Sequence, residues 1–401
     1  MSLPSALRLE APVTRPLPEA AGGEGDGLIR VLHVLSTLLP GGSELSVLRL
    51  TGALDPRRYR TSVAFLRGEA VLRRDFEAIG AEVVPVRLRT HFDPFCLLRL
   101  RALVARGRHD LVHTHMDVAD FYGALAGRLG GARAVVSTKH APDEFRSRRT
   151  WKRYPFLLLE RLAYEMDDAV IVVSQGLAAF LEETERLPRH KMVIIGHGVD
   201  GGAPPLPRAE ARAALGLPGL DPLIGSVGRL SREKGHAFLL RALPAIVAAF
   251  PGAGCVLAGD GPSRRDLEDE ARRLGMADRV LFLGHRGDVT AILSALDLFV
   301  QPSLYEGFGM SLLEAMAARL PIVATHVGGI PEVVDDQVAG VLVPPADAAA
   351  LARAAITLLS DPERARRLGD RAARLVAERH SSSSVAARVD ALYRRVLGSP
   401  A

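Results

Sequence analysis

The stretch Leu298-Phe-Val-Gln-Pro-Ser-Leu-Tyr-Glu306-Gly-Phe-Gly-Met-Ser-Leu-Leu-Glu314 joins an apolar run to an amphipathic segment through a glycine-rich turn. The apolar run is typical of a buried parallel strand, and a helix is expected from about Ser311. Gly307 and Gly309 leave the backbone amides of the turn uncovered, and the helix would point its positive end at them. A diphosphate bound in the turn would therefore meet both the backbone amides and the helix dipole.

Two carboxylates flank this turn. Because a helix rises about 1.5 Å per residue, Glu306 and Glu314 can lie within about 10 Å of each other on one side. Such carboxylates accept hydrogen bonds from sugar and ribose hydroxyls. Ser311-Leu-Leu-Glu314 also fits a capping box, in which Glu314 would only satisfy a backbone amide, and both interpretations of Glu314 stay open. Glu306 is followed by Gly-Phe-Gly rather than by a helix, which favours a ligand-binding role for the pair.

Length and composition indicate a two-domain globular protein. The chain has 401 residues, 48% hydrophobic and 24% charged, and this length exceeds what one core usually holds. Its 51 Lys and Arg against 46 Asp and Glu give a net charge of +5, which weakly favours an anionic ligand or membrane surface over nucleic acid, so no nucleic-acid partner is expected. Cys96 and Cys255 stand far apart among apolar residues and are expected to be buried thiols.

No segment of the sequence reaches the length of about 18 apolar residues that a transmembrane helix needs. Residues 1–27 are rich in Pro, Gly and Ala and lack the apolar centre of a signal peptide, so a disordered lead-in is expected. A cytoplasmic location follows by default, with peripheral attachment to the inner face of the membrane as an open alternative.

Short apolar runs alternate with amphipathic stretches along the chain, a pattern typical of parallel sheets with helices on both faces. We expect an α/β protein with two doubly wound, Rossmann-like domains at 28–200 and 208–380, joined by a Gly- and Pro-rich hinge at 201–207. A terminal helix within 381–401 is expected to cross back to the first domain. The expected strands are Ile29–Leu35, Thr61–Phe65, Glu82–Val86, Leu111–Thr114, Ala134–Ser137, Ala169–Val173, Met192–Ile195, Leu223–Val227, Gly254–Ala258, Val280–Leu283, Leu298–Gln301, Ile322–Thr325 and Gly340–Val343.

In such folds the loops after the strands carry the binding residues. Gly228-Arg229-Leu-Ser-Arg-Glu-Lys234-Gly235 follows the strand at 223–227 and leads into a helix. The planar guanidinium of Arg229 can donate two hydrogen bonds to phosphate oxygens, and Lys234 can act as a point charge. The loop is therefore interpreted as a diphosphate clamp. Taken alone, such a sequence is more often a solvated basic loop.

Two other glycine pairs follow strands. Gly41-Gly42 comes after the first strand and opens a helix; it could cradle a phosphate, admit an acceptor or be only a tight turn. Gly259-Asp-Gly261 lacks the third glycine of a dinucleotide-binding loop, so a dinucleotide site is not favoured.

His113-Thr-His115 closes the strand at 111–114. Alternation along a strand puts both imidazoles on one side, although the chain turns here and a metal-chelating pair is not assured. His113 is expected to be a structural histidine. His115 is expected to make a polar contact with a reacting sugar or its leaving phosphate.

These motifs resemble those of the retaining GT-B glycosyltransferases of the group-one type, glycosyltransferase family four. The resemblance runs from about Arg30 to Val396. The family pattern Glu-x-Phe-Gly, with a second Glu eight positions after the first, matches Glu306-Gly-Phe-Gly and Glu314. Its pattern Gly-Arg-Leu-x-x-x-Lys-Gly matches residues 228–235.

The resemblance implies a role for each matching residue. Arg229 and Lys234 would hold the donor diphosphate, Glu306 and the backbone of the glycine turn would meet the donor sugar, and Glu314 would bind ribose. His115 would contact the transferred sugar, and the turn at 283–286 would border the nucleotide base. The implied donor site is Gly41, Gly42, Gly228, Arg229, Lys234, His285, Arg286, Glu306, Gly307, Phe308, Gly309, Met310, Ser311 and Glu314, and the implied catalytic residues are His115, Arg229, Lys234 and Glu306.

The family moves a sugar from a nucleoside-diphosphate sugar with retention of configuration, by front-face departure of the diphosphate and without an enzymic nucleophile. Arg229 and Lys234 would then stabilise the leaving charge, and a glycosidase mechanism with paired carboxylates is not favoured. A UDP-sugar is the expected donor, and a glycan, lipid-linked or small molecule the acceptor. No Asp-x-Asp motif stands where a metal would be needed, so no cofactor is expected and divalent metal should be dispensable.

The basic and aromatic segment Arg146–Phe156 could lie on an anionic membrane that carries a lipid-linked acceptor, or be a solvated loop before a core helix. Two other functions stay open: a nucleotide-sugar 2-epimerase of the same architecture, and a non-catalytic sugar-nucleotide-binding protein. The presence of two cations and two carboxylates in matching loops argues against the non-catalytic alternative.

Overall fold

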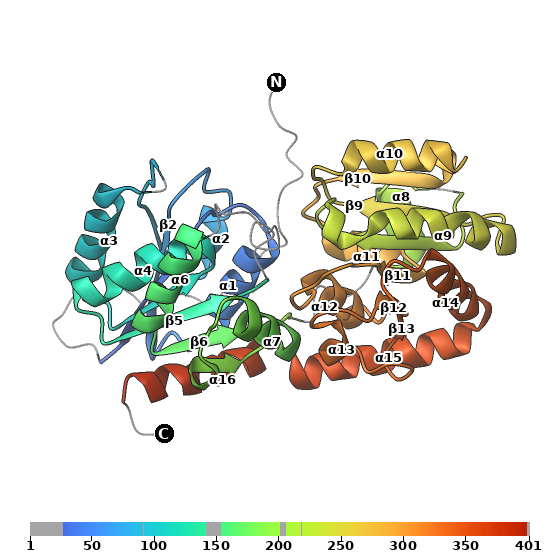
Figure 1. Ribbon diagram of the computed structural model, residues 1–401. Coiled ribbons are helices and arrows are strands. Elements are labelled where there is room, and N and C mark those ends of the chain that lie inside the picture. Colours follow the sequence, from blue (N-terminus) through green and yellow to red (C-terminus); the bar gives the residue numbers. More distant parts are fainter. Residues whose placement is uncertain (1–26, 91, 142–153, 201–205, 218, 399–401) are drawn as a thin grey trace. The chain divides into compact units, whose positions relative to one another are not determined.

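The computed structural model describes residues 27–90, 92–141, 154–200, 206–217 and 219–398 (Figure 1). They form two compact units. The first holds the described residues up to Gly198 together with those from Ser382 onward, and the second runs from Val199 to Ser381. Most of the hinge expected at 201–207 and the larger part of the segment at 146–156 lie outside the described residues, so both stay predictions.

The first unit is built on a sheet of seven parallel strands in the order β3-β2-β1-β4-β5-β6-β7. Their residues are mostly buried, as expected of parallel strands covered on both faces. The order reverses between β1 and β4, and ligands of such sheets bind at the carboxyl ends beside this switch point. The strands are β1 (Ile29–Leu35), β2 (Tyr59–Phe65), β3 (Glu82–Pro85), β4 (Leu111–His115), β5 (Ala134–Lys139), β6 (Ala169–Val172) and β7 (Met192–Ile194).

Helices cover both faces of this sheet (Figure 1). They are α1 (Gly42–Ala53), α2 (Arg73–Ala78), α3 (Pro94–Arg106), α4 (Asp117–Gly130), α6 (Tyr154–Met166), α7 (Gln175–Thr184) and α16 (Ser382–Val396). Because successive residues of a strand point to opposite faces, Val31 packs in one core with Tyr393 of α16. Its neighbour Leu32 packs in another core with Leu100 of α3. The last helix of the chain therefore covers the first sheet.

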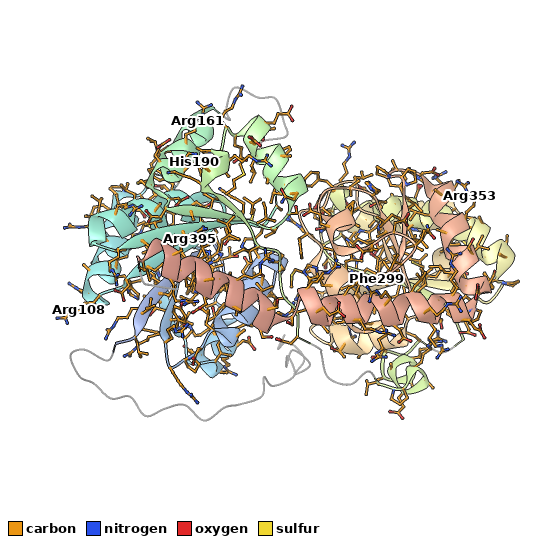
Figure 2. All side chains as sticks on the ribbon, turned by 90° about the horizontal axis from the view of Figure 1, so that it is seen from below. Arg108, Arg161, His190, Phe299, Arg353 and Arg395 are labelled. Carbon is orange, nitrogen blue, oxygen red and sulfur yellow. The ribbon has the colours of Figure 1, made fainter. Side chains whose placement is uncertain are left out.

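The second unit repeats this plan with six parallel strands in the order β10-β9-β8-β11-β12-β13. The switch point lies between β8 (Leu223–Val227) and β11 (Leu298–Gln301). Phe299 of β11 is fully buried inside this unit (Figure 2). The other elements are β9 (Gly254–Ala258), β10 (Val280–Gly284), β12 (Ile322–Thr325), β13 (Val341–Val343), α8 (Arg208–Ala214), α9 (His236–Ala249), α10 (Arg264–Arg273), α11 (Val289–Ala295), α12 (Met310–Ala317), α13 (Ile330–Val333), α14 (Ala348–Ser360) and α15 (Pro362–Arg379).

Every strand expected from the sequence is present, and the α/β class with two doubly wound sheets is confirmed. Several strands, β1, β8 and β11 among them, have the expected bounds, and the rest differ by about two residues or fewer at an end. The helix expected from about Ser311 begins at Met310, and the terminal helix expected within 381–401 begins at Ser382, after a break at His380 and Ser381. Among the described helices, none has both the length and the hydropathy of a membrane span.

Candidate functional site

The loops after β8 and β11 are held together at the switch point of the second sheet. The carbonyl of Glu233 accepts hydrogen bonds from the amides of Leu304 and Tyr305, at 2.7 and 3.2 Å. Gly235 has a φ of +65°, and a Cβ placed on it would lie 2.0 Å from the carbonyl oxygen of Pro302. Only glycine fits this close approach. The loop at 228–235, which we call the cationic loop, therefore lies directly against the glycine-rich turn after β11.

Lys234 and Glu306 form an ion pair at this junction. Lys234 Nζ donates to Glu306 Oε2 at 2.7 Å, and the Glu306 side chain is 8% exposed. The same oxygen accepts from Gln301 Nε2 at 3.0 Å and from Ser303 Oγ at 3.2 Å. The resemblance assigns Lys234 to the diphosphate and Glu306 to the sugar; in the structure each is also the other's partner. An ammonium group has three donors, so Lys234 can hold Glu306 and a phosphate oxygen together.

Gln301 and Ser303 are site residues that the sequence motifs do not single out. Gln301 is 2% exposed and Ser303 is fully buried. Buried polar groups need partners, and these two find theirs in each other and in Glu306. The sequence does carry a signal for these two site residues: a polar residue ends an apolar strand, and a second polar residue follows two positions later.

Helix α12 begins at the glycine turn and has Gly309 as its N-cap, at a φ of +97°. Ser311 lies within the first turn, and its Oγ donates to Gln301 Oε1 at 3.3 Å. The capping box proposed for Ser311 and Glu314 is therefore wrong, because Ser311 is not the N-cap residue. The first amides of a helix have no partner within it, so the start of α12 can bind an anion.

The turn is fixed from two sides. Phe308 is 4% exposed, and its ring centroid lies 5.5 Å from that of His380, so its side chain packs in the core and only its backbone can meet a ligand. The carbonyl of Glu306 accepts the amide of Gly329 at 3.1 Å, and a Cβ on Gly328 would lie 1.9 Å from the same oxygen. The loop after β12 therefore sets the backbone position of Glu306.

The remaining basic residues of the expected donor site have different surroundings. Arg229 and His285 are exposed. Arg286 donates to both carboxylate oxygens of Asp288, at 2.8 and 2.5 Å. This hydrogen bonding raises the pKa of Arg286 above its usual range. All three residues follow β8 or β10, so the fold brings them to the carboxyl edge of one sheet, although β9 lies between those strands.

The glycines of Gly259-Asp-Gly261 have a packing role. A Cβ on Gly259 would lie 1.9 Å from the carbonyl oxygen of Gly228, and one on Gly261 would lie 2.5 Å from that of Leu230. These glycines let the loop after β9 rest on the backbone of the cationic loop, which accounts for them without a dinucleotide.

In the first unit, Gly41 is the N-cap of α1 and Gly42 is its first residue. Glu44 closes this turn, because its carboxylate accepts hydrogen bonds from Thr37 Oγ1 and Ser43 Oγ, both at 2.7 Å. A Cβ on Gly41 would lie 2.6 Å from the same carboxylate. A negative charge in the turn repels phosphate, so the geometry favours a sugar or acceptor hydroxyl over phosphate as the ligand of this loop.

His33, His113 and His115 bring one ring nitrogen each within 4.8 Å of one another, which could hold a metal ion. Both nitrogens of His113, however, lie 2.6 Å from hydroxyl oxygens, those of Tyr393 and Thr138. A metal would have to displace one of these hydroxyls. His113 has the hydrogen bonds of the structural histidine expected from the sequence.

His115 is 3% exposed and borders a cavity of about 30 Å³ in the first unit, together with His140 and His197. The two ring nitrogens of His115 lie 3.0 Å from His33 and 3.2 Å from His140. A hydrogen bond from His115 to a sugar must therefore replace one of these contacts.

Two family models match the chain: Glycosyl transferases group 1 over residues 207–375, and Glycosyltransferase Family 4 over residues 40–201. The D-inositol 3-phosphate glycosyltransferase of Mycobacterium marinum is 31% identical over 404 residues, covering 96% of this chain and 84% of that protein. The alpha-D-kanosaminyltransferase of Streptomyces kanamyceticus is 30% identical over 320 residues, covering 75% and 81%.

The fold also matches that of Anabaena HepE in complex with UDP and glucose, with a TM-score of 0.79 and 22% identity, over 92% of this chain and 100% of that one. The chain belongs to glycosyltransferase family four, the group-one type. It is a glycosyltransferase with the GT-B fold.

Proposed function

We propose that this glycosyltransferase takes its sugar from a UDP-sugar bound at the switch point between β8 and β11. The observation that carries the proposal is the Lys234–Glu306 ion pair beside the start of α12. A cation and free helix amides suit the oxygens of a diphosphate, and a carboxylate suits the hydroxyls of a sugar. That HepE, which shares the fold, forms complexes with UDP and with UDP-glucose supports uridine as the nucleoside.

The transfer breaks the bond between C1 of the sugar and a phosphate oxygen, and the bonding electrons leave with UDP. The acceptor oxygen then bonds to C1 from the same face, and its proton passes to the leaving phosphate. Arg229 and Lys234 stabilise the charge that develops on the diphosphate. Glu306 Oε2 already accepts three hydrogen bonds, which makes it a poor nucleophile and favours retention without a covalent intermediate.

The other contacts follow from the resemblance. Glu314 binds the ribose hydroxyls, and His285 and Arg286 border the base. Gly41, Gly42 and His115 of the first unit serve the sugar and the acceptor. The relative from Mycobacterium marinum acts, by its name, on D-inositol 3-phosphate. This supports a small polyhydroxylated acceptor, with glycans and lipid-linked acceptors at a membrane surface as further members of the test panel.

Purified protein incubated with a series of UDP-sugars should release UDP only when a polyol, glycan or lipid acceptor is present. Proton NMR of the first-formed product should show the anomeric configuration of the donor, and EDTA should leave the rate unchanged. An inverted anomer would remove the retaining assignment. Isomerisation of the donor sugar without any acceptor would favour the 2-epimerase alternative, and loss of transfer in EDTA would show that a metal is needed.

A further inference from the structure

Four buried imidazoles form a continuous row in the first unit, from β1 along the carboxyl edge of the sheet. His33 Nδ1 lies 3.0 Å from His115 Nε2, and His115 Nδ1 lies 3.2 Å from His140 Nε2. His140 Nδ1 in turn lies 3.4 Å from His197 Nε2, and His197 Nδ1 lies 2.7 Å from Ser46 Oγ. We call these four side chains and the Ser46 hydroxyl the histidine row.

Three imidazoles of the histidine row, those of His33, His115 and His140, are held in their neutral form. Burial lowers the pKa of His33 to about 3 and takes the pKa of His115 and that of His140 well below the usual range. A neutral imidazole carries one N–H donor and one bare nitrogen acceptor. Each contact between two rings therefore needs a hydrogen on one side only, and the tautomer of one ring dictates that of the next.

Only two tautomer patterns of these three rings satisfy the two contacts among them: hydrogens on every Nδ1 or on every Nε2. His33 Nε2 is buried at the inner end of the row and has no hydrogen-bond partner among the described residues. An unpaired buried N–H is rarer in proteins than an unpaired acceptor. The pattern with hydrogens on every Nδ1 leaves His33 Nε2 as a bare acceptor and lets His140 donate to His197, so it is the favoured pattern.

We propose that the histidine row fixes His115 as an Nδ1–H tautomer in one orientation, and that His33 is a positioning residue for sugar transfer. The second part rests on the proposed contact of His115 with the sugar. A sugar or phosphate oxygen that reaches His115 replaces His140 as the acceptor of the Nδ1–H, and the ring need not turn because His33 still holds the Nε2 side. Such preorganisation is how an active site avoids reorganisation during the reaction.

The first test uses the unmodified protein, labelled with ¹⁵N in its histidines. NMR couplings across N–H···N hydrogen bonds should connect Nδ1 of His33 to Nε2 of His115, and so on along the row, with each hydrogen on Nδ1. Hydrogen on Nε2 of His115, or mixed tautomers, would overturn the proposal. This result does not depend on transfer activity, so it stands or fails separately from the proposed function.

The second test removes the inner end of the row, which holds His115 when the sugar is bound. His33→Ala should lower kcat about tenfold or more, because a misplaced contact group slows the reaction without loosening donor binding, and the donor KM should stay near that of the parent. Added 4-methylimidazole should restore part of the lost rate. His190→Ala removes an exposed histidine of the same unit (Figure 2) and should change neither constant. An unchanged kcat in His33→Ala, with transfer established in the parent, would overturn the positioning role alone.

Discussion

Lys234→Ala should weaken the binding of UDP about tenfold or more and lower the rate of transfer further. A hydrogen bond to a charged group contributes about 1.5 to 3 kcal/mol, and each 1.4 kcal/mol corresponds to about tenfold in affinity. The substitution also takes away the cation that holds Glu306 in place, at 2.7 Å in the structure. Calorimetric titration with UDP measures the first effect, and steady-state kinetics at saturating donor measures the second.

Arg232→Ala is the matched control for this substitution. Arg232 lies in the same loop, carries the same charge and is exposed. Its removal should leave the affinity for UDP close to that of the parent protein. If both variants lose affinity equally, general attraction of the basic loop explains the binding, and if neither does, the diphosphate is not bound at Lys234.

Gly235→Ala should destabilise the protein by about 3 kcal/mol, which corresponds to a fall of roughly 6 to 12 °C in the Tm of a unit of this size. Alanine in the left-handed conformation costs about 1 to 2 kcal/mol by itself. Its Cβ would in addition lie 2.0 Å from the carbonyl oxygen of Pro302. Pro302 belongs to the same loop as Leu304 and Tyr305, whose amides donate to the carbonyl of Glu233. Relief of this clash separates the two loops, so the affinity for UDP should fall as well.

Gly275→Ala is the control that separates the backbone strain of the left-handed conformation from the steric clash with Pro302. Gly275 has a φ of +70°, and a Cβ placed on it would have no described atom within 4 Å. This variant should show only the conformational cost and should bind UDP normally. Thermal unfolding followed by circular dichroism measures both variants; equal losses in the two would mean that the contact with Pro302 does not matter.

The sheets could be predicted because their strands are covered on both faces. A strand of that kind appears in the sequence as an uninterrupted apolar run, as in Leu298–Gln301 or Gly254–Ala258, and both have the expected bounds. Helix starts were harder, since the start of α12 depends on the left-handed conformation of Gly309 rather than on the nearest serine. Ser311 was available as a cap and instead binds Gln301.

The sequence motifs predict which residues form the candidate site, but they do not predict the contacts between those residues. Lys234 and Glu306 belong to recognisable motifs, yet their ion pair joins positions 72 apart and depends on β8 and β11 being neighbours. The contacts of the histidine row were even less predictable from the sequence. Its imidazoles come from separate segments that only the sheet order brings together, and His115 alone stood in a motif.

A crystal structure of the protein with UDP tests the placement of the donor most directly. We expect the diphosphate oxygens within hydrogen-bonding distance of Lys234 Nζ and of the amides at the start of α12, with the ribose hydroxyls at Glu314. UDP bound at the Gly41–Gly42 loop of the first unit, or a diphosphate that touches neither Lys234 nor α12, would contradict the proposal that the switch point between β8 and β11 is the donor site.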